Sequence, residues 1–300
     1  MRSRLLILCP GQGGQSAAMF DLARGDARAA ALLDALALPA DGDIFSNRRA
    51  QPAIVAAGLA MWTALRDDCP TPALVAGYSI GELTAYGVAG AFSADTAVAL
   101  AVRRAELMDE CVGEPQAMVA ITGPLAATLP PLLLPHGFRA AIQTSEDSII
   151  AGGPASAIPA LTAAAGPVAR VQVLPVAVAS HTPMMAGAVV PFAETLLDAR
   201  WAAMNAPVVA GIDAQPMLAR AGGAGVEDAI EHLARQLAEP VRWMDCMDAI
   251  AEQGITAALE LGPGSALSKM LSARHAHIEC RSAADFRTLD GIRRWLERMA

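Results

Sequence analysis

Short apolar runs alternate with longer helical patterns along this chain. Leu5–Cys9, 73–77 and 257–261 are apolar runs of strand length, and each leads into a turn that contains glycine. Alanine-rich stretches near 21–38 and 52–67 have helical character, and Pro52 suits the first turn of the second helix. Repetition of strand, glycine loop and helix predicts an α/β fold with a mainly parallel sheet.

The pattern changes between residues 116 and 178, where shorter strands dominate. Helical segments are expected after Gly123 and from Gly152–Pro154 to Ala165, between strands at 117–121, 138–143, 147–151 and 169–178. The order β-α-β-β-α-β predicts a ferredoxin-like unit with its own sheet. We therefore expect a small subdomain, 116–178, inserted into a large α/β subdomain formed by 1–115 and 179–300. Later elements are expected at 184–199 (helix), 208–212 (strand), 226–237 and 243–253 (helices) and from 285 (helix).

Composition excludes several classes of protein. Hydrophobic residues make up 54% and charged residues 17%, which is typical of a globular chain, and no apolar run is long enough to predict a membrane span. The net charge of −8 without a basic stripe argues against nucleic acid. Five cysteines without a C-x-x-C pair predict free thiols in a reducing cytoplasm. The pair His275 and His277 has no further ligands nearby in sequence, so no metal site is expected.

The segment Gly77-Tyr78-Ser79-Ile80-Gly81 lies between a predicted strand and a predicted helix. This G-x-S-x-G pattern is typical of a nucleophile elbow, a tight turn that lifts a serine hydroxyl above the sheet edge. The N-terminus of the following helix would direct its free N–H groups and positive dipole toward that serine. Ser79 is therefore the candidate nucleophile, although the motif alone also arises by chance in glycine-rich chains.

A nucleophilic serine needs a base, and His181 is the best candidate. It follows an apolar stretch at a predicted strand-to-helix junction, whereas the other histidines lie among polar residues. Alone, it would be interpreted as a core histidine. No acidic third member of a triad can be identified. Gln12, in the loop after the first strand, lies at the same sheet edge as the elbow and could donate to an oxyanion, but a phosphate nest or a simple glycine turn fits it too.

Two adjacent arginines, Arg103 and Arg104, interrupt a helix with an otherwise apolar face. Successive helical residues point about 100° apart, so at most one of them faces a cleft. An arginine there would suit a substrate carboxylate, because its planar fork binds both oxygens. Alternatively both are surface residues, one of them paired with Glu106 or Asp109.

With these residues identified, the chain resembles the malonyl-CoA:acyl-carrier-protein transacylase family over nearly its whole length. The ordered blocks that carry the resemblance are Pro10–Gln15, Gln51–Ala53, Gly77–Glu82, Arg104–Met108, Ser180–His181, Gln236–Trp243 and Leu261–Gly264. The resemblance implies an α/β-hydrolase-like core with a ferredoxin-like insert. It implies an S-malonyltransferase without a bound cofactor, which uses malonyl-CoA as the substrate and the prosthetic-group thiol of an acyl carrier protein as the acceptor.

The resemblance also assigns roles to individual residues. Ser79 would be the nucleophile and His181 the general base, and the main-chain carbonyl of Gln236 would orient the histidine. The side chain of Gln12 and the backbone N–H of Ile80 would form the oxyanion hole. Arg104, rather than Arg103, would hold the malonyl carboxylate, and Gln51 would line the pocket.

One block departs from the usual family pattern. The family has histidine before the nucleophile and tyrosine after the motif's glutamate, where this chain has Tyr78 and Leu83. The stretch Gly77–Ala91 is similar to the transacylase subunit of biotin-independent malonate decarboxylase. That similarity implies transfer to the complex's own carrier subunit, whose prosthetic group is phosphoribosyl-dephospho-CoA, rather than to a phosphopantetheine carrier of fatty-acid or polyketide synthesis.

Two other functions would use the same residues differently. A serine hydrolase would pass the acyl group from Ser79 to water, and the missing acid counts mildly against it. A non-catalytic module that docks carriers would not need Ser79, His181, Gln12 and Arg104 together. Hydrolysis without a carrier identifies the first, and failure to react with a serine-directed fluorophosphonate identifies the second.

Overall fold

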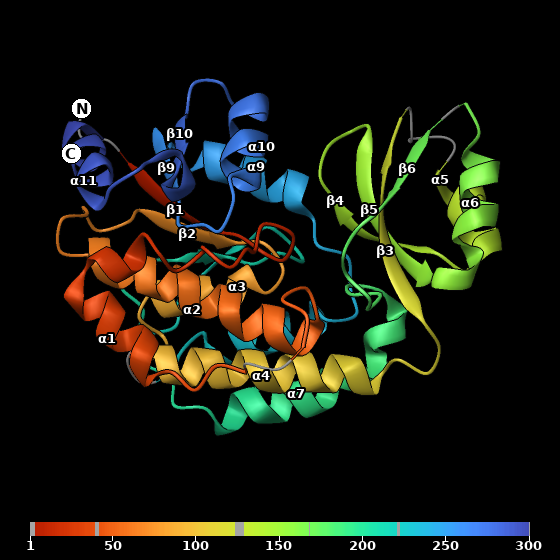
Figure 1. Cartoon of the computed structure of the whole chain (residues 1–300), viewed down its shortest axis with the longest axis horizontal. Helices are drawn as coiled ribbons and strands as arrows, with labels where there is room; N and C mark the ends of the chain where they lie inside the picture. Colours follow the sequence, from red (N-terminus) through yellow and green to blue (C-terminus); the bar gives the residue numbers. More distant parts are fainter. Residues whose placement is uncertain (1–3, 40–41, 124–128, 168, 221–222, 300) are drawn as a thin grey trace.

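The computed structural model of the chain describes residues 4–39, 42–123, 129–167, 169–220 and 223–299, and its strands form two separate sheets (Figure 1). The larger sheet has six strands in the order β10-β9-β1-β2-β7-β8, parallel except for the β7–β8 pair. Its strands are β1 (Leu5–Cys9), β2 (Leu74–Gly77), β7 (Val208–Val209), β8 (Pro216–Met217), β9 (Ala257–Glu260) and β10 (Glu279–Ser282). The predicted α/β fold with a mainly parallel sheet is confirmed.

Helices cover both faces of this sheet because its central strands are apolar on both sides. Leu5, Ile7 and Cys9 of β1 enter one core, and Leu6 and Leu8 enter the other. The first core lies under α1 (Ala27–Ala35), α2 (Asn47–Leu65), α3 (Gly81–Val88), α4 (Ala94–Glu110), α7 (Ala186–Asp198), α8 (Val226–Arg235) and α11 (Leu289–Met299). The second lies under α9 (Trp243–Glu252) and α10 (Ala266–Arg274). Such burial on both faces is typical of parallel sheets.

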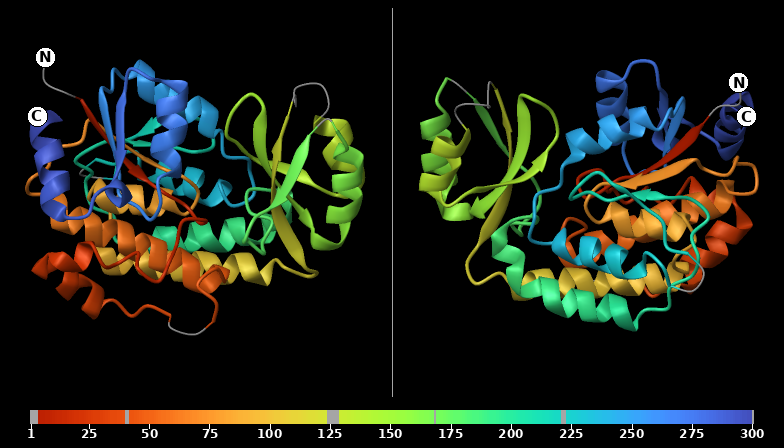
Figure 2. Two further views of the ribbon diagram at one scale, coloured as in Figure 1. Left: turned by 45° about the horizontal axis from the view of Figure 1, so that its top comes forward. Right: turned by 180° about the vertical axis from the view of Figure 1, so that it is seen from behind.

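The smaller sheet is antiparallel and has the order β4-β5-β3-β6. Its elements are β3 (Gln116–Thr122), α5 (Leu129–Leu133), β4 (Arg139–Gln143), β5 (Ser148–Pro154), α6 (Ile158–Ala165) and β6 (Arg170–Val173). Figures 1 and 2 show this sheet beside the large one, with α5 and α6 on its outer side. A separate cluster of buried apolar residues fills the space between this sheet and its two helices. The element order β-α-β-β-α-β is the one predicted.

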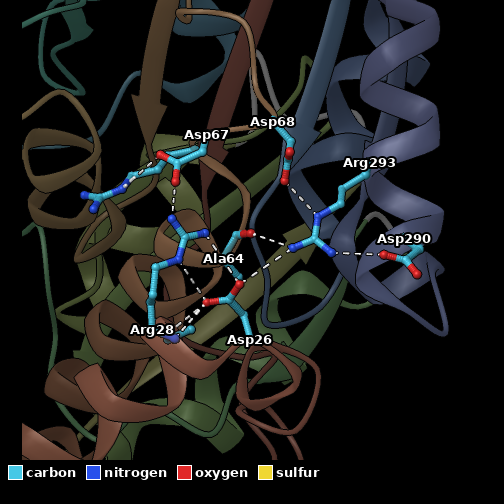
Figure 3. A network of polar contacts seen from close by, with 9 residues as sticks. Asp26, Arg28, Ala64, Asp67, Asp68, Asp290 and Arg293 are labelled. Atoms are coloured by element: carbon cyan, nitrogen blue, oxygen red, sulfur yellow. Dashed lines mark hydrogen bonds and ion pairs between the residues drawn. The ribbon is translucent and has the colours of Figure 1, made fainter.

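Ion pairs join the start of α1, the end of α2 and α11 (Figure 3). The Asp26 side chain accepts from two backbone N–H groups of α1 and therefore caps that helix. Arg293 of α11 lies 3.7 Å from Asp26 and 2.8 Å from Asp68, and it also pairs with Asp290 of its own helix at 3.0 Å. This network ties the C-terminal helix to the N-terminal part of the fold. No helix within the described part of the chain is long and apolar enough to cross a membrane.

Several predicted element boundaries were wrong. Helix α2 begins at Asn47, so Pro52 lies inside the helix and not in its first turn. Gly152–Pro154 continue strand β5, because their backbone pairs with β3 (Gly152 with Met118, Pro154 with Gln116), and α6 starts only at Ile158. Strand β6 ends at Val173 instead of reaching 178, and β7 covers two residues of the predicted 208–212.

The C-terminal region holds two elements that were not predicted, α10 and β10. Strand β10 is the edge strand of the large sheet and pairs with β9; its residues are mostly half-buried or exposed, and it lacks an apolar pattern. The last helix begins at Leu289, after a short 3-10 turn at Ala283–Asp285, and not at 285. In the predicted helical segment after Gly123, residues 124–128 lie outside the described residues, and α5 follows them.

Candidate active site

The elbow around Ser79 joins β2 to α3 at the carboxyl edge of the large sheet (Figure 1). Ser79 has a φ of +56°, a left-handed conformation that is strained for a residue with a side chain. The turn is possible because Gly81 passes directly against the carbonyl of Cys9, and Gly77 against the backbone of Gly81 and Glu82. A Cβ at either glycine would overlap with that backbone. The predicted sharp turn is therefore present, and packing of β1 against the elbow enforces it.

The structure brings His181 and Gln236 to Ser79 from distant parts of the chain. Ser79 Oγ lies 2.7 Å from His181 Nε2, and His181 Nδ1 lies 2.5 Å from the main-chain oxygen of Gln236, at the end of α8. A carbonyl oxygen can only accept, so Nδ1 carries the hydrogen and Nε2 is left to accept the proton of the serine hydroxyl. No carboxylate is needed to set this tautomer.

The environment of His181 keeps its imidazole neutral. The side chain is almost fully buried, and its backbone has a φ of +60°. Burial and, second, the positive charge of Arg104 lower the pKa of His181 to about 3, while the hydrogen bond to Gln236 works in the opposite direction. The imidazole is thus in the form that can accept a proton throughout the neutral range.

Gln12 lies in the loop that follows β1, beside the elbow. A Cβ added to the neighbouring Gly11 would lie 2.6 Å from Tyr78 O and 3.6 Å from Ser79 Cβ, so this loop and the elbow are in contact. The amide nitrogen of Gln12 is buried and has no hydrogen-bond partner among the described residues. Among the backbone hydrogen bonds that the described residues form outside regular helices and strands, none has the N–H of Ile80 as its donor. Each N–H group thus lacks such a partner among the described residues, one in the elbow and one in the loop that packs against it.

Arg104 contacts the side chains of both Gln51 and Gln236. Arg104 is 2% exposed, whereas the side chain of Arg103 is 40% exposed and pairs with Glu106 and Glu110, so only one of the two arginines faces inward, as expected. Arg104 Nη1 donates to Gln51 Oε1 at 2.6 Å. Burial lowers the pKa of Arg104 to about 10, which still leaves the guanidinium charged at neutral pH.

Two further residues of this network were missed from the sequence. Asn47 accepts from Gln51 Nε2 at 2.5 Å. Glu82, in the first turn of α3, is 1% exposed, and its Oε2 accepts from Gly211 N at 3.0 Å and from the side-chain nitrogen of Gln236. The sequence feature that could have indicated Glu82 is that it is the one charged residue of the mainly buried helix directly after the elbow. A cavity of about 890 Å³ lies elsewhere, and none of the site residues above lines it.

Comparisons with known proteins identify the family of this chain. The sequence matches the family described as acyl transferase domain over residues 7–285. The malonyl CoA-acyl carrier protein transacylase of Mycobacterium tuberculosis is 32% identical, with 96% of this chain and 99% of the relative covered. The crystal structure of MCAT from Mycobacterium tuberculosis is similar with a TM-score of 0.86 at 29% identity, over 99% of both chains. A malonyl-transacylase in complex with its type II PKS acyl-carrier protein is similar with a TM-score of 0.84 at 26% identity, over 99% of this chain and all of the other. The chain therefore belongs to the malonyl-CoA:acyl-carrier-protein transacylase family of acyl transferases.

Proposed function

We propose that this protein transfers malonyl groups from malonyl-CoA to the thiol of an acyl carrier protein through a malonyl ester of Ser79. The observation that carries the proposal is a buried, charged arginine beside a serine–histidine pair. No ion pair among the described residues includes Arg104, and its two side-chain contacts there are to neutral amides. A buried cation is costly unless it is paired, so the site is suited to a substrate that brings its own carboxylate.

In the first step, Ser79 Oγ attacks the thioester carbonyl while His181 Nε2 takes the hydroxyl proton. The carbonyl oxygen becomes an oxyanion, to which the Gln12 amide and the Ile80 N–H would donate. Collapse of this intermediate breaks the carbon–sulfur bond, and the leaving CoA sulfur receives the proton from His181. The elbow supports the predicted relationship of the core to α/β-hydrolases, with a thiol in place of water as the final acceptor.

In the second step, the carrier thiol gives its proton to His181 and attacks the ester carbonyl. A tetrahedral intermediate forms again, and Ser79 Oγ leaves with the proton from His181. A carbonyl behind the histidine suits this chemistry, because thiolates are good leaving groups that need little protonation. Neither step requires a bound cofactor, and Arg104 would hold the malonyl carboxylate through both, with Gln51 supporting its guanidinium.

The comparisons favour an acyl carrier protein of fatty-acid or polyketide synthesis as the acceptor. The similarity of Gly77–Ala91 to the malonate decarboxylase transacylase subunit supports the carrier of that complex as a second candidate. Residues 116–178 would form the small subdomain and 1–115 with 179–300 the large one. All five cysteines are free thiols, which fits the cytoplasmic location expected.

The test is a direct search for the acyl-enzyme. Incubation with malonyl-CoA should increase the protein mass by one malonyl group on Ser79, and Ser79→Ala should remain unmodified. An unmodified wild-type protein would refute the proposal, and rapid malonyl-CoA hydrolysis without a carrier would favour the hydrolase alternative. Transfer rates to a holo carrier of fatty-acid synthesis and to the malonate decarboxylase carrier then decide the acceptor.

A further inference from the structure

The buried carboxylate of Glu82 has no part in the acyl-transfer steps above, although it lies one turn after the nucleophile. Its Oε2 accepts from the backbone of Gly211 and from the side chain of Gln236, and its Oε1 has no partner among the described residues. Glu82 is 1% exposed, and burial of a carboxylate without a direct cationic partner lowers the stability of the folded state. Its contacts therefore call for a functional explanation.

The side chain of Gln236 connects Glu82 to Arg104. The amide nitrogen of Gln236 donates to Glu82, and the amide oxygen lies 3.4 Å from Arg104 Nη2. An amide has one accepting end and one donating end, so the acceptor at Glu82 decides which end faces the guanidinium. With the amide reversed, two groups that only donate would face each other at Arg104.

The contact from Glu82 through the Gln236 amide to Arg104, here called the relay, has an advantage over a direct ion pair between Glu82 and Arg104. A carboxylate in contact with Arg104 would occupy the guanidinium fork that the malonyl carboxylate needs. The amides of Gln51 and Gln236 hold the guanidinium by one nitrogen each and carry no charge. Glu82 stays one side chain further away, where it orients the amide without competing for the fork.

We propose that Glu82 is a positioning residue for malonyl recognition, which acts through the Gln236 side chain on the direction of the Arg104 guanidinium. The inference rests on the proposed function, because it assigns Arg104 to the malonyl carboxylate. Burial raises the pKa of Glu82 to about 7. Both protonation states retain an oxygen that can accept from Gln236, so the relay depends on the acceptor and not on the charge.

The experiment compares malonyl and acetyl loading of Ser79, because acetyl-CoA has no carboxylate for Arg104. Glu82→Met removes the acceptor at similar length and should lower kcat/KM for malonyl-CoA at least tenfold, while the value for acetyl-CoA stays within threefold. Glu82→Gln keeps an oxygen at the same place and should leave both values within threefold. Thr84→Val, a buried polar residue two positions further along α3, is the matched control and should change neither.

A double-mutant cycle tests whether Glu82 acts through Gln236. Gln236→Met keeps the main-chain carbonyl for His181 and should cause the same selective loss, and Glu82→Met combined with it should be no worse than either alone. Equal loss of malonyl and acetyl transfer in Glu82→Met, additive effects in the double variant, or a Glu82→Gln variant as impaired as Glu82→Met would overturn the proposal. Glu82→Asp, which withdraws the acceptor by one methylene, should show a smaller selective loss and replaces Glu82→Met if that variant fails to fold. A wild type that loads no malonyl group would instead refute the proposed function.

Discussion

The lowered pKa of His181 leads to a measurable pH dependence of Ser79 reactivity. A histidine with an ordinary pKa near 6.5 would be only about one-tenth neutral at pH 5.5, and the reactivity of its serine would fall about tenfold between pH 8 and that value. With a pKa of about 3, His181 stays almost fully neutral over the same interval. The rate of Ser79 labelling by a fluorophosphonate should therefore change less than about twofold from pH 8 to 5.5.

A tenfold fall centred near pH 6.5 would refute this reasoning, because it would mean that the imidazole titrates as if it were in water. The Glu82→Gln variant serves as a control, because the pKa of Glu82 lies near 7 and could produce a separate inflection. In Arg104→Gln, one of the two causes of the lowered pKa is removed. The pH at which Ser79 labelling falls on the acid side should then be higher than in the wild type. It should still lie below 6.5, since burial is the larger cause of the lowered His181 pKa.

The same pKa also affects folding stability, with a defined sign. His181 binds a proton more weakly in the folded state than in the unfolded state, so its neutral form contributes stability above about pH 6.5 that is lost as the pH falls toward 3. At about 1.4 kcal/mol per pH unit, the loss from this residue amounts to about 3 kcal/mol by pH 4.5. The difference in unfolding free energy between wild type and His181→Gln should shift by that amount between pH 7 and 4.5, in favour of the variant, as measured by urea denaturation. A constant difference would contradict the buried neutral histidine.

Three further substitutions test other parts of the structure. Arg104→Ala should lower kcat/KM for malonyl loading about 10- to 100-fold, from the loss of a charge-assisted contact, and leave acetyl loading unchanged; a uniform loss would make the arginine structural. Gly81→Ala should destabilise the protein by at least about 1–3 kcal/mol in urea unfolding and reduce fluorophosphonate labelling, because its Cβ overlaps with the backbone of β1. Gly113→Ala, where nothing lies within 4 Å, is its control, and equal behaviour of the two would be incompatible with a tight elbow. Asp26→Ala should cost about 1 kcal/mol of unfolding free energy through loss of the α1 cap (Figure 3), and Asp290→Ala, an exposed ion-pair partner, should cost less than 0.5 kcal/mol; the reverse order would count against the cap.

Local features of the chain were predictable because their physical causes lie within a few residues. The elbow needs an apolar strand, two glycines and a helix start, all of which are contiguous between 73 and 88. That Arg103 and Arg104 do not both face inward follows from the angle between successive helical residues, and the family resemblance indicated Arg104 as the inward one. The Ser93 cap of α4 is equally local, because its side chain accepts from the backbone N–H of Thr96, three residues further along the chain.

Predictions failed where neighbours distant in sequence outweigh local preference. Gly152 and Gly153 were predicted to open a helix, but pairing with β3 keeps them in a strand. Strand β10 has no apolar pattern and exists because β9 offers an open edge for hydrogen bonds. Glu82 would be placed at a helix surface by its charge alone, and only the packing of Gly211 and Gln236 above α3 accounts for its burial.

The sequence by itself determined which residues form the elbow, that two adjacent helical arginines cannot both face inward, and which family the chain resembles. These depend on short-range backbone geometry and on motifs that can be compared directly. No local pattern brings His181 and Gln236, 102 and 157 positions after Ser79, to the serine; the resemblance implied their roles, and the tertiary structure joins all three residues in one hydrogen-bonded chain. It also decided the tautomer and lowered pKa of the histidine and the link from Glu82 to Arg104, because these depend on burial and on distances that no local pattern contains.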